Sequence, residues 1–126
     1  MTALVFVPKA VRLANTHNAL SRTRPLAGTA GVGQAAAMDA EGNWILRAGT
    51  GRAAGIFLGI TDGRLEGNVG DDAEVLMEGI VAGYVVAPGV VVYDGGDGTL
   101  EDTGTTEQKI GVGLNDNLLY IRPDLA

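Results

Sequence analysis

The segment from Gly70 to Pro123 decides the fold: GDDAEVLMEGIVAGYVVAPGVVVYDGGDGTLEDTGTTEQKIGVGLNDNLLYIRP. Short runs of valine, isoleucine and leucine alternate there with glycine, aspartate and asparagine. Runs of this kind, bounded by turn residues, are typical of strands in a β-sandwich or β-barrel. Within residues 73–81 the period of two places four apolar residues on one face, namely Ala73, Val75, Met77 and Val81.

The same rhythm extends back to residue 38. Further strands are expected at residues 44–47 and 54–60, with tight turns at Asp62-Gly63 and at residues 94–99. A chain of 126 residues is long enough for one domain. We therefore predict an all-β fold: a small β-sandwich or β-barrel body over residues 38–126, preceded by an extended, largely irregular N-terminal arm over residues 1–37.

The arm differs from the body in charge. Residues 1–38 carry four bases and no acid, whereas residues 39–126 carry all fifteen acids and five bases, a net charge of −10. Basic segments are often interaction arms, although a solvated tail is the alternative. The arm also contains apolar residues that a tail in water does not need. We predict that eight of its residues contact a partner: Leu4, Phe6, Lys9, Val11, Arg12, Leu13, Arg22 and Arg24.

Residues that could do chemistry are scarce. The single serine and single histidine, Ser21 and His17, lie four residues apart in the arm, with no acid before Asp39. A catalytic triad needs an imidazole oriented by a buried carboxylate, so we predict no enzyme activity. Residues 31–36 match a loose dinucleotide fingerprint, but no strand precedes them, and a flexible bend is the favoured interpretation.

We predict no metal and no cofactor. The chain has no cysteine, and carboxylates gather only in loops at residues 71–74 and 94–102. Their spacing fits neither an EF-hand nor a nonapeptide repeat, so ordinary turns are favoured and calcium stays the alternative. No apolar run approaches the length that spans a bilayer, and the N-terminus does not have the order of a signal peptide. An acidic body argues against nucleic acid.

Residues 55–123 resemble, in the order of their elements, the small all-β decoration (cement) proteins that coat the heads of tailed bacteriophages. In that family a glycine-aspartate turn leads into a strand that ends in EG-[IV], PGxxVY leads into the next strand, and an IGVAL-like strand follows. The matching residues here are Gly55–Ile60, Gly70–Val75, Glu78–Val81, Ala87–Tyr93, Gly98–Leu100 and Lys109–Leu114. Gly113 stands where alanine is common.

The resemblance implies a structural protein that binds the outer surface of a phage head and stabilises contacts between major capsid protein subunits. It implies a homotrimer on the capsid, and a location in the virion after synthesis in the host cytoplasm. The arm is longer and more basic than the family pattern. The alternative function is a small β-barrel module that binds carbohydrate or peptide on a virion or host surface, through Trp44 or the tyrosines.

Overall fold

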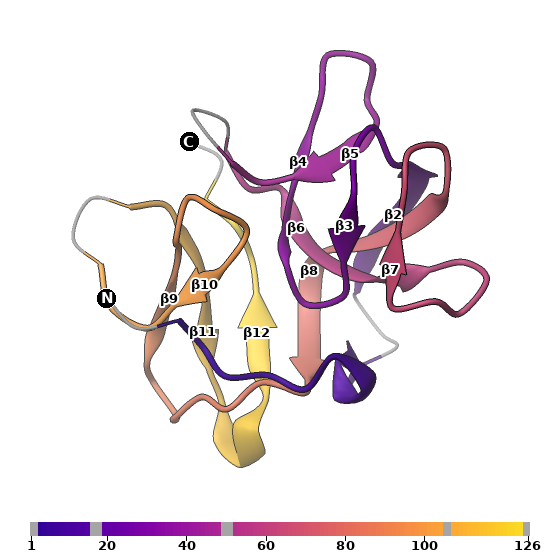
Figure 1. Cartoon of the computed structure of the whole chain (residues 1–126). Coiled ribbons are helices and arrows are strands. Elements are labelled where there is room, and N and C mark those ends of the chain that lie inside the picture. The colour runs from indigo at the N-terminus through magenta and orange to yellow at the C-terminus, as the bar shows by residue number, and fades with distance from the viewer. Residues whose placement is uncertain (1–2, 16–18, 49–51, 105–106, 125–126) are drawn as a thin grey trace.

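The computed structural model describes residues 3–15, 19–48, 52–104 and 107–124 (Figure 1). His17 and residues 49–51 lie outside this part of the chain. Within it the chain forms twelve strands and two single-turn 3₁₀ helices. The strands are β1 (Arg12–Leu13), β2 (Leu20–Pro25), β3 (Ala30–Gly31), β4 (Ala35–Met38), β5 (Trp44–Leu46), β6 (Gly55–Ile60), β7 (Glu66–Gly67), β8 (Asp72–Ala82), β9 (Val91–Asp94), β10 (Leu100–Glu101), β11 (Lys109–Gly113) and β12 (Leu119–Ile121). The helices are η1 (Pro8–Ala10) and η2 (Asn115–Asn117).

The predicted all-β class is confirmed. Among the described strands, ten share one sheet whose main path is β10-β9-β11-β12-β8-β6-β4-β5, while β1 and β2 both pair with β8 off this path. β3 and β7 form a separate pair. The Ala27 N–H donates to the Trp44 carbonyl oxygen at 2.9 Å, and Leu26 bridges Trp44. These contacts bring β5 back to the end of β2, so this part of the sheet curls into a half-barrel.

Strand β8 is the central strand of the molecule and pairs with four other strands. Its first part, residues 72–76, lies between β2 and β6, and its second part, residues 79–82, lies between β1 and β12. Figure 1 shows the result: β2 to β7 gather on one side of β8, and β9 to β12 gather on the other. Both halves of the fold therefore depend on this one strand.

A bulge changes which face of β8 points inward. Leu20 is opposite Glu78 and Ser21 is opposite Leu76, so Met77 has no partner on β2. An extra residue of this kind reverses the alternation beyond it. The prediction that Val81 shares a face with Ala73, Val75 and Met77 is therefore wrong.

The core consists of two clusters, and the reversal places Val81 in the same cluster as Leu76. The larger cluster contains Leu76 and Val81 of β8, packed with Ile56 from β6 and with Ile110, Leu119 and Ile121 from the other half. The smaller cluster contains Ala73 and Val75, packed with Phe57, Ile60 and Trp44. In and just after β11, Ile110 is fully buried, whereas Val112 and Leu114 are half-buried.

Buried polar contacts also join the two halves of the fold. The Arg47 guanidinium Nε lies 2.6 Å from the Asp94 carboxylate Oδ2, and both side chains are almost fully buried. The Gln108 amide accepts from the Ala53 N–H and donates to the Ala53 carbonyl oxygen, each at 2.8 Å. The Gln108 bonds give buried polar groups the partners that they need away from water, and the ion pair places the Arg47 charge beside the Asp94 carboxylate.

The predicted N-terminal arm is more regular than its sequence indicates. Residues 20–25 form β2 and residues 35–38 form β4, both within the main sheet. Residues 31–36, for which a flexible bend is expected, include the end of β3 and the start of β4, and η1 and β1 form earlier in the arm. The physical reason is that β8 needs hydrogen-bond partners on both of its edges, and β2 supplies them on one edge. The sequence of β2, LSRTRP, does not alternate between apolar and polar residues, so it does not indicate a strand by itself.

Gly113 has a structural reason to differ from alanine. Its N–H donates to the Val90 carbonyl oxygen and its carbonyl oxygen accepts from the Gly89 N–H, both at 2.8 Å. A Cβ placed on Gly113 would lie 2.8 Å from Val86 Cγ2 and closer still to the Ala87 carbonyl oxygen. The glycine thus allows two backbone segments to approach.

Replacing this glycine tests the packing. We expect Gly113→Ala to lower the free energy of unfolding by about 1–3 kcal/mol, because overpacking against backbone forces a shift. Urea denaturation measures the change. Gly28→Ala is the matched control, since nothing lies within 4 Å of that position, and its effect should stay within about 0.5 kcal/mol. Equal effects at both positions would contradict the packing argument.

Candidate partner-binding surface along the N-terminal edge

Residues 3–14 and β2 together form what we call the N-terminal edge. It runs antiparallel beside residues 72–85, with β2 along the first part of β8, β1 along its end, and residues 5–7 beside residues 83–85. Three backbone bonds hold the front of this edge: Val7 N–H to Gly83 O (3.1 Å), Val85 N–H to Val5 O (2.8 Å) and Ala14 N–H to Ile80 O (2.7 Å). In Figure 1 this segment, in indigo, crosses the lower side of the molecule.

Side chains at the front of the edge alternate between core and solvent, as in any strand. Leu4 is 9% exposed, whereas Val5 and Val7 are 66% and 58% exposed. Val85, which faces Val5 on the neighbouring strand, is 61% exposed. We call Val5, Val7 and Val85 the valine strip. It is a group of apolar side chains on the outer face of the molecule.

The structure places the four predicted apolar contact residues against the chain's own core. Leu4 and Val11 belong to the larger cluster, and Phe6 and Leu13 pack against it. In this conformation they stabilise the fold itself. Their contact with a partner stays a prediction. Hydrophobicity alone could not tell whether these side chains cover this protein or another one.

Phe6 holds the front of the edge in place. Its ring lies 5.3 Å from the Tyr84 ring in a tilted arrangement, and it covers Gly33 so closely that a Cβ there would overlap it. The Tyr84 hydroxyl donates to the Gly33 carbonyl oxygen at 2.6 Å. Burial raises the pKa of Tyr84 well above its ordinary value, so the hydroxyl remains a donor.

Of the four predicted basic contact residues, three are on the surface. Lys9, Arg12 and Arg22 are exposed. Arg24 is half-buried: its Nε donates to the Gly42 carbonyl oxygen at 3.1 Å and its Nη2 to Asn43 Oδ1 at 2.8 Å. Arg24 therefore fixes the turn between β4 and β5. Charges on an edge strand also discourage unwanted pairing, so part of their role is protective.

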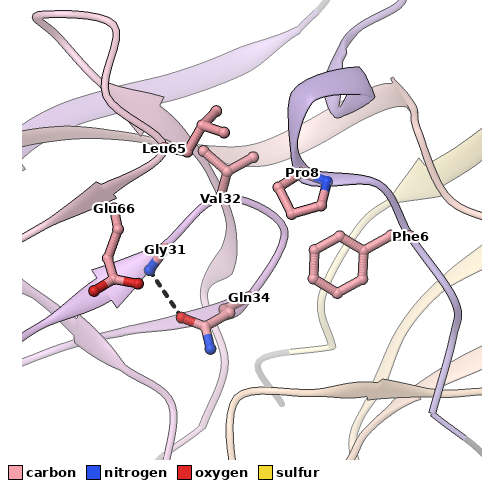
Figure 2. Close-up of a pocket in the computed structure, with 7 residues that line it drawn as sticks. All are labelled: Phe6, Pro8, Gly31, Val32, Gln34, Leu65 and Glu66. Atoms are coloured by element: carbon pink, nitrogen blue, oxygen red, sulfur yellow. Dashed lines mark hydrogen bonds between the residues drawn. The ribbon is translucent and has the colours of Figure 1, made fainter.

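A hollow of about 280 Å³ opens beside the N-terminal edge (Figure 2). Phe6 and Pro8 form one wall, and β3 with the chain before β7 forms the other. The lining is apolar at Val32 and Leu65 and polar at Gln34 and Glu66. The Gln34 amide oxygen accepts from the Gly31 N–H at 2.8 Å, which fixes the side chain at the rim.

Next in sequence to Leu65, which lines the hollow, Arg64 forms ion pairs with two aspartates. The Arg64 guanidinium lies 2.7 Å from the Asp62 carboxylate and 2.9 Å from the Asp71 carboxylate, so its charge is neutralised locally. The pKa of Asp62 is lowered, first by the Arg64 backbone N–H. The pKa of Asp71 is lowered by the Asn68 backbone N–H and then by the Arg64 side chain. Both carboxylates stay ionised at neutral pH, on a surface unlike the basic edge.

Other residues considered in the sequence have structural roles here. Trp44 is fully buried, and its indole N–H donates to the Arg22 carbonyl oxygen at 3.1 Å, so it does not present a stacking surface. Asp97 accepts from Thr99 at the predicted hairpin tip, a contact that lowers its pKa. Across the described ranges, no group of three or more histidine, aspartate or glutamate side chains could hold a metal ion.

No protein-family model and no curated protein matches this chain. No helix in the described part of the chain is long and apolar enough to cross a membrane.

The sequence could have indicated one part of the valine strip: the run Leu4–Val7 is apolar at every position, as in a strand that is covered on both faces. Val85 gives no such local signal.

Removing the Phe6 ring should loosen the front of the edge. We expect Phe6→Ala to lower the free energy of unfolding by about 2 kcal/mol, less than for a fully buried phenylalanine. The Val7 and Val85 amides should exchange their hydrogens at least tenfold faster, because their bonds join the segment to residues 83–85. Hydrogen exchange followed by NMR measures this. Val5→Ala, at an exposed position, should leave both quantities unchanged; equal loss in both variants would contradict the role of Phe6.

Proposed function

We propose that this protein decorates the head of a tailed phage, where it binds the major capsid protein and acts by binding alone. The proposal includes self-association as a homotrimer on the outer capsid surface of the virion, after synthesis in the host cytoplasm. It draws on the resemblance of residues 55–123 to decoration proteins. The resembling segments fall, in chain order, on β6, β8, β9, β10 and β11, with the two-residue β7 between the first two.

The observation that carries the proposal is the exposed basic edge on an acidic molecule. Lys9, Arg12 and Arg22 are exposed along one edge of the sheet, while residues 39–126 have a net charge of −10. A separation of charge of this kind orients the molecule toward an acidic surface. Binding to many equivalent sites on an assembled shell would stabilise that shell by mass action.

Deleting the arm would not test this proposal cleanly. Residues 2–34 include all of β2, and Leu26, Ala30 and Val32 within them are buried. Their loss would remove a sheet partner of β8 and part of both clusters. Charge reversal on the surface leaves these contacts in place and is the sharper experiment.

We expect Arg12→Glu/Arg22→Glu to weaken co-sedimentation with expanded capsid shells at least tenfold. The expected cause is loss of attraction to acidic coat surface, so wild-type binding should weaken as salt rises. Lys109→Glu/Arg122→Glu is the matched control: it changes the net charge equally at exposed positions on β11 and beyond β12. An equal loss in both variants, or none in the first, would refute the basic edge as the contact.

The hollow in Figure 2 favours one alternative, a small β-barrel module that binds carbohydrate or peptide. It is concave, largely apolar and carries a few polar groups, as ligand sites do. Because Trp44 is buried, such binding would rely on Phe6 and the rim residues Gln34 and Glu66. NMR titration with glycans and short peptides separates the two functions: saturable shifts at these residues, without shell binding, favour the module.

A further inference from the structure

The hollow beside the N-terminal edge is polar at one end and apolar at the other. Figure 2 shows the side chains of Gln34 and Glu66 on either side of Gly31, with the rings of Phe6 and Pro8 at the far end. Apolar walls select a ligand by its shape, and the few polar groups fix its orientation. A matching ligand is therefore apolar along most of its length and carries hydrogen-bond donors at one end.

Gly31 leaves room between three groups that accept hydrogen bonds. A Cβ at this position would lie 3.4 Å from the Leu65 carbonyl oxygen, 3.5 Å from Gln34 Oε1 and 3.9 Å from Glu66 Cγ. The first two oxygens each accept a backbone N–H at 2.8 Å, from Val32 and Gly31 respectively. Each still has a second lone pair. The space beside Gly31 is therefore surrounded by acceptors.

The charge of the Glu66 carboxylate is not neutralised within the described part of the chain. Glu66 is exposed, and it has neither an ion pair nor a side-chain hydrogen bond among the described residues. Arg64, two positions away, pairs instead with Asp62 and Asp71. Lys9, the cation nearest to the opposite wall in sequence, is exposed and does not pair with Glu66. The carboxylate can therefore attract a cation from outside the chain.

We propose that the hollow binds the side chain of a lysine from a partner protein. An ammonium group is a compact charge with three donors, one for each acceptor group around Gly31. Lysine also buries its methylene stem along apolar surface while its charge stays in a polar place. A volume of about 280 Å³ is at the lower limit for small-molecule sites and matches a single side chain. Arginine fits less well, because its planar fork binds a carboxylate from one direction.

A lysine side chain also fits better than a free polyamine. A polyamine has ammonium groups at both ends of its methylene chain, whereas the far end of the hollow offers only the rings of Phe6 and Pro8. The inference goes beyond the decoration function, which uses the basic edge, and it gives the hollow of the alternative function a ligand of stated chemistry. It rests on the hollow alone and is tested without a capsid.

NMR titration with Nα-acetyl-lysine N-methylamide, which has a peptide group on each side of the lysine, tests the inference. We expect saturable shifts of the Gly31, Val32 and Glu66 amide signals, with a dissociation constant on the order of 1 mM. Acetylation of the ligand's ε-amine removes the charge and keeps the stem, so this ligand should bind at least tenfold more weakly. Spermidine should also bind more weakly. Equal or tighter binding of either ligand, or shifts that do not saturate, overturn the inference.

Two variants change the site without removing core contacts. Gly31→Ala places a methyl group among the acceptors at ordinary contact distances, and Glu66→Gln removes the charge at an exposed position. Each should weaken binding of the lysine ligand at least tenfold, as expected for a lost hydrogen bond to a charged group. The matched controls are Gly28→Ala, which meets nothing within 4 Å, and Glu41→Gln, which is exposed on a turn. Both should leave binding unchanged, and equal effects in variants and controls contradict the site.

The basic-edge variant separates this site from the decoration function. Arg12→Glu/Arg22→Glu should bind the lysine ligand as the wild-type protein does, although it should lose binding to shells. If it alters lysine binding as much as Glu66→Gln does, the ligand follows the overall charge rather than the hollow, and the inference is wrong. If the wild-type protein binds the lysine ligand but no shell, the decoration function fails while the lysine site stands.

Discussion

The pairing of β8 on both edges is the constraint on which the rest of the structure depends. A long buried strand must find partners for the N–H and C=O groups on each side. β6 and β12 pair with its two parts, and the N-terminal edge runs along what remains. Alternation along its first part gives Val75 to the smaller core cluster and Leu76 to the larger one, and the bulge at Met77 lets Val81 also join the larger cluster.

This constraint explains which parts of the fold the sequence could predict. Strands such as β6, β9 and β11 are bounded by glycine and aspartate turns, so their positions follow from local chemistry. β2 was not predicted, because LSRTRP is polar on both faces and is a strand only through its pairing with β8. The bulge at Met77 also escapes a period-two analysis, since the register is fixed by neighbours far away in the sequence.

The candidate surface shows the same limit. The exposure of Lys9, Arg12 and Arg22 could be predicted, because isolated charges almost always stay in water. The inward direction of Leu4 and Phe6 could not be predicted, because a run that is apolar at every position does not show which of its side chains face the core. The valine strip is formed by Val5 and Val7 together with Val85, about eighty positions later in the chain. The segment that completes the sheet is thus also the one that presents the surface.

The long reach of the N-terminal edge has a consequence for synthesis on the ribosome. Residues 5–7 emerge before their backbone partners at residues 83–85, which follow about eighty positions later in the chain. Contacts of such separation form slowly, and translation proceeds at about 5–20 residues per second. For several seconds the apolar run LVFV therefore lacks the backbone partners with which it pairs in the folded protein. During that interval a newly made chain exposes this apolar segment, and transiently exposed apolar surface is where aggregation begins and chaperones act.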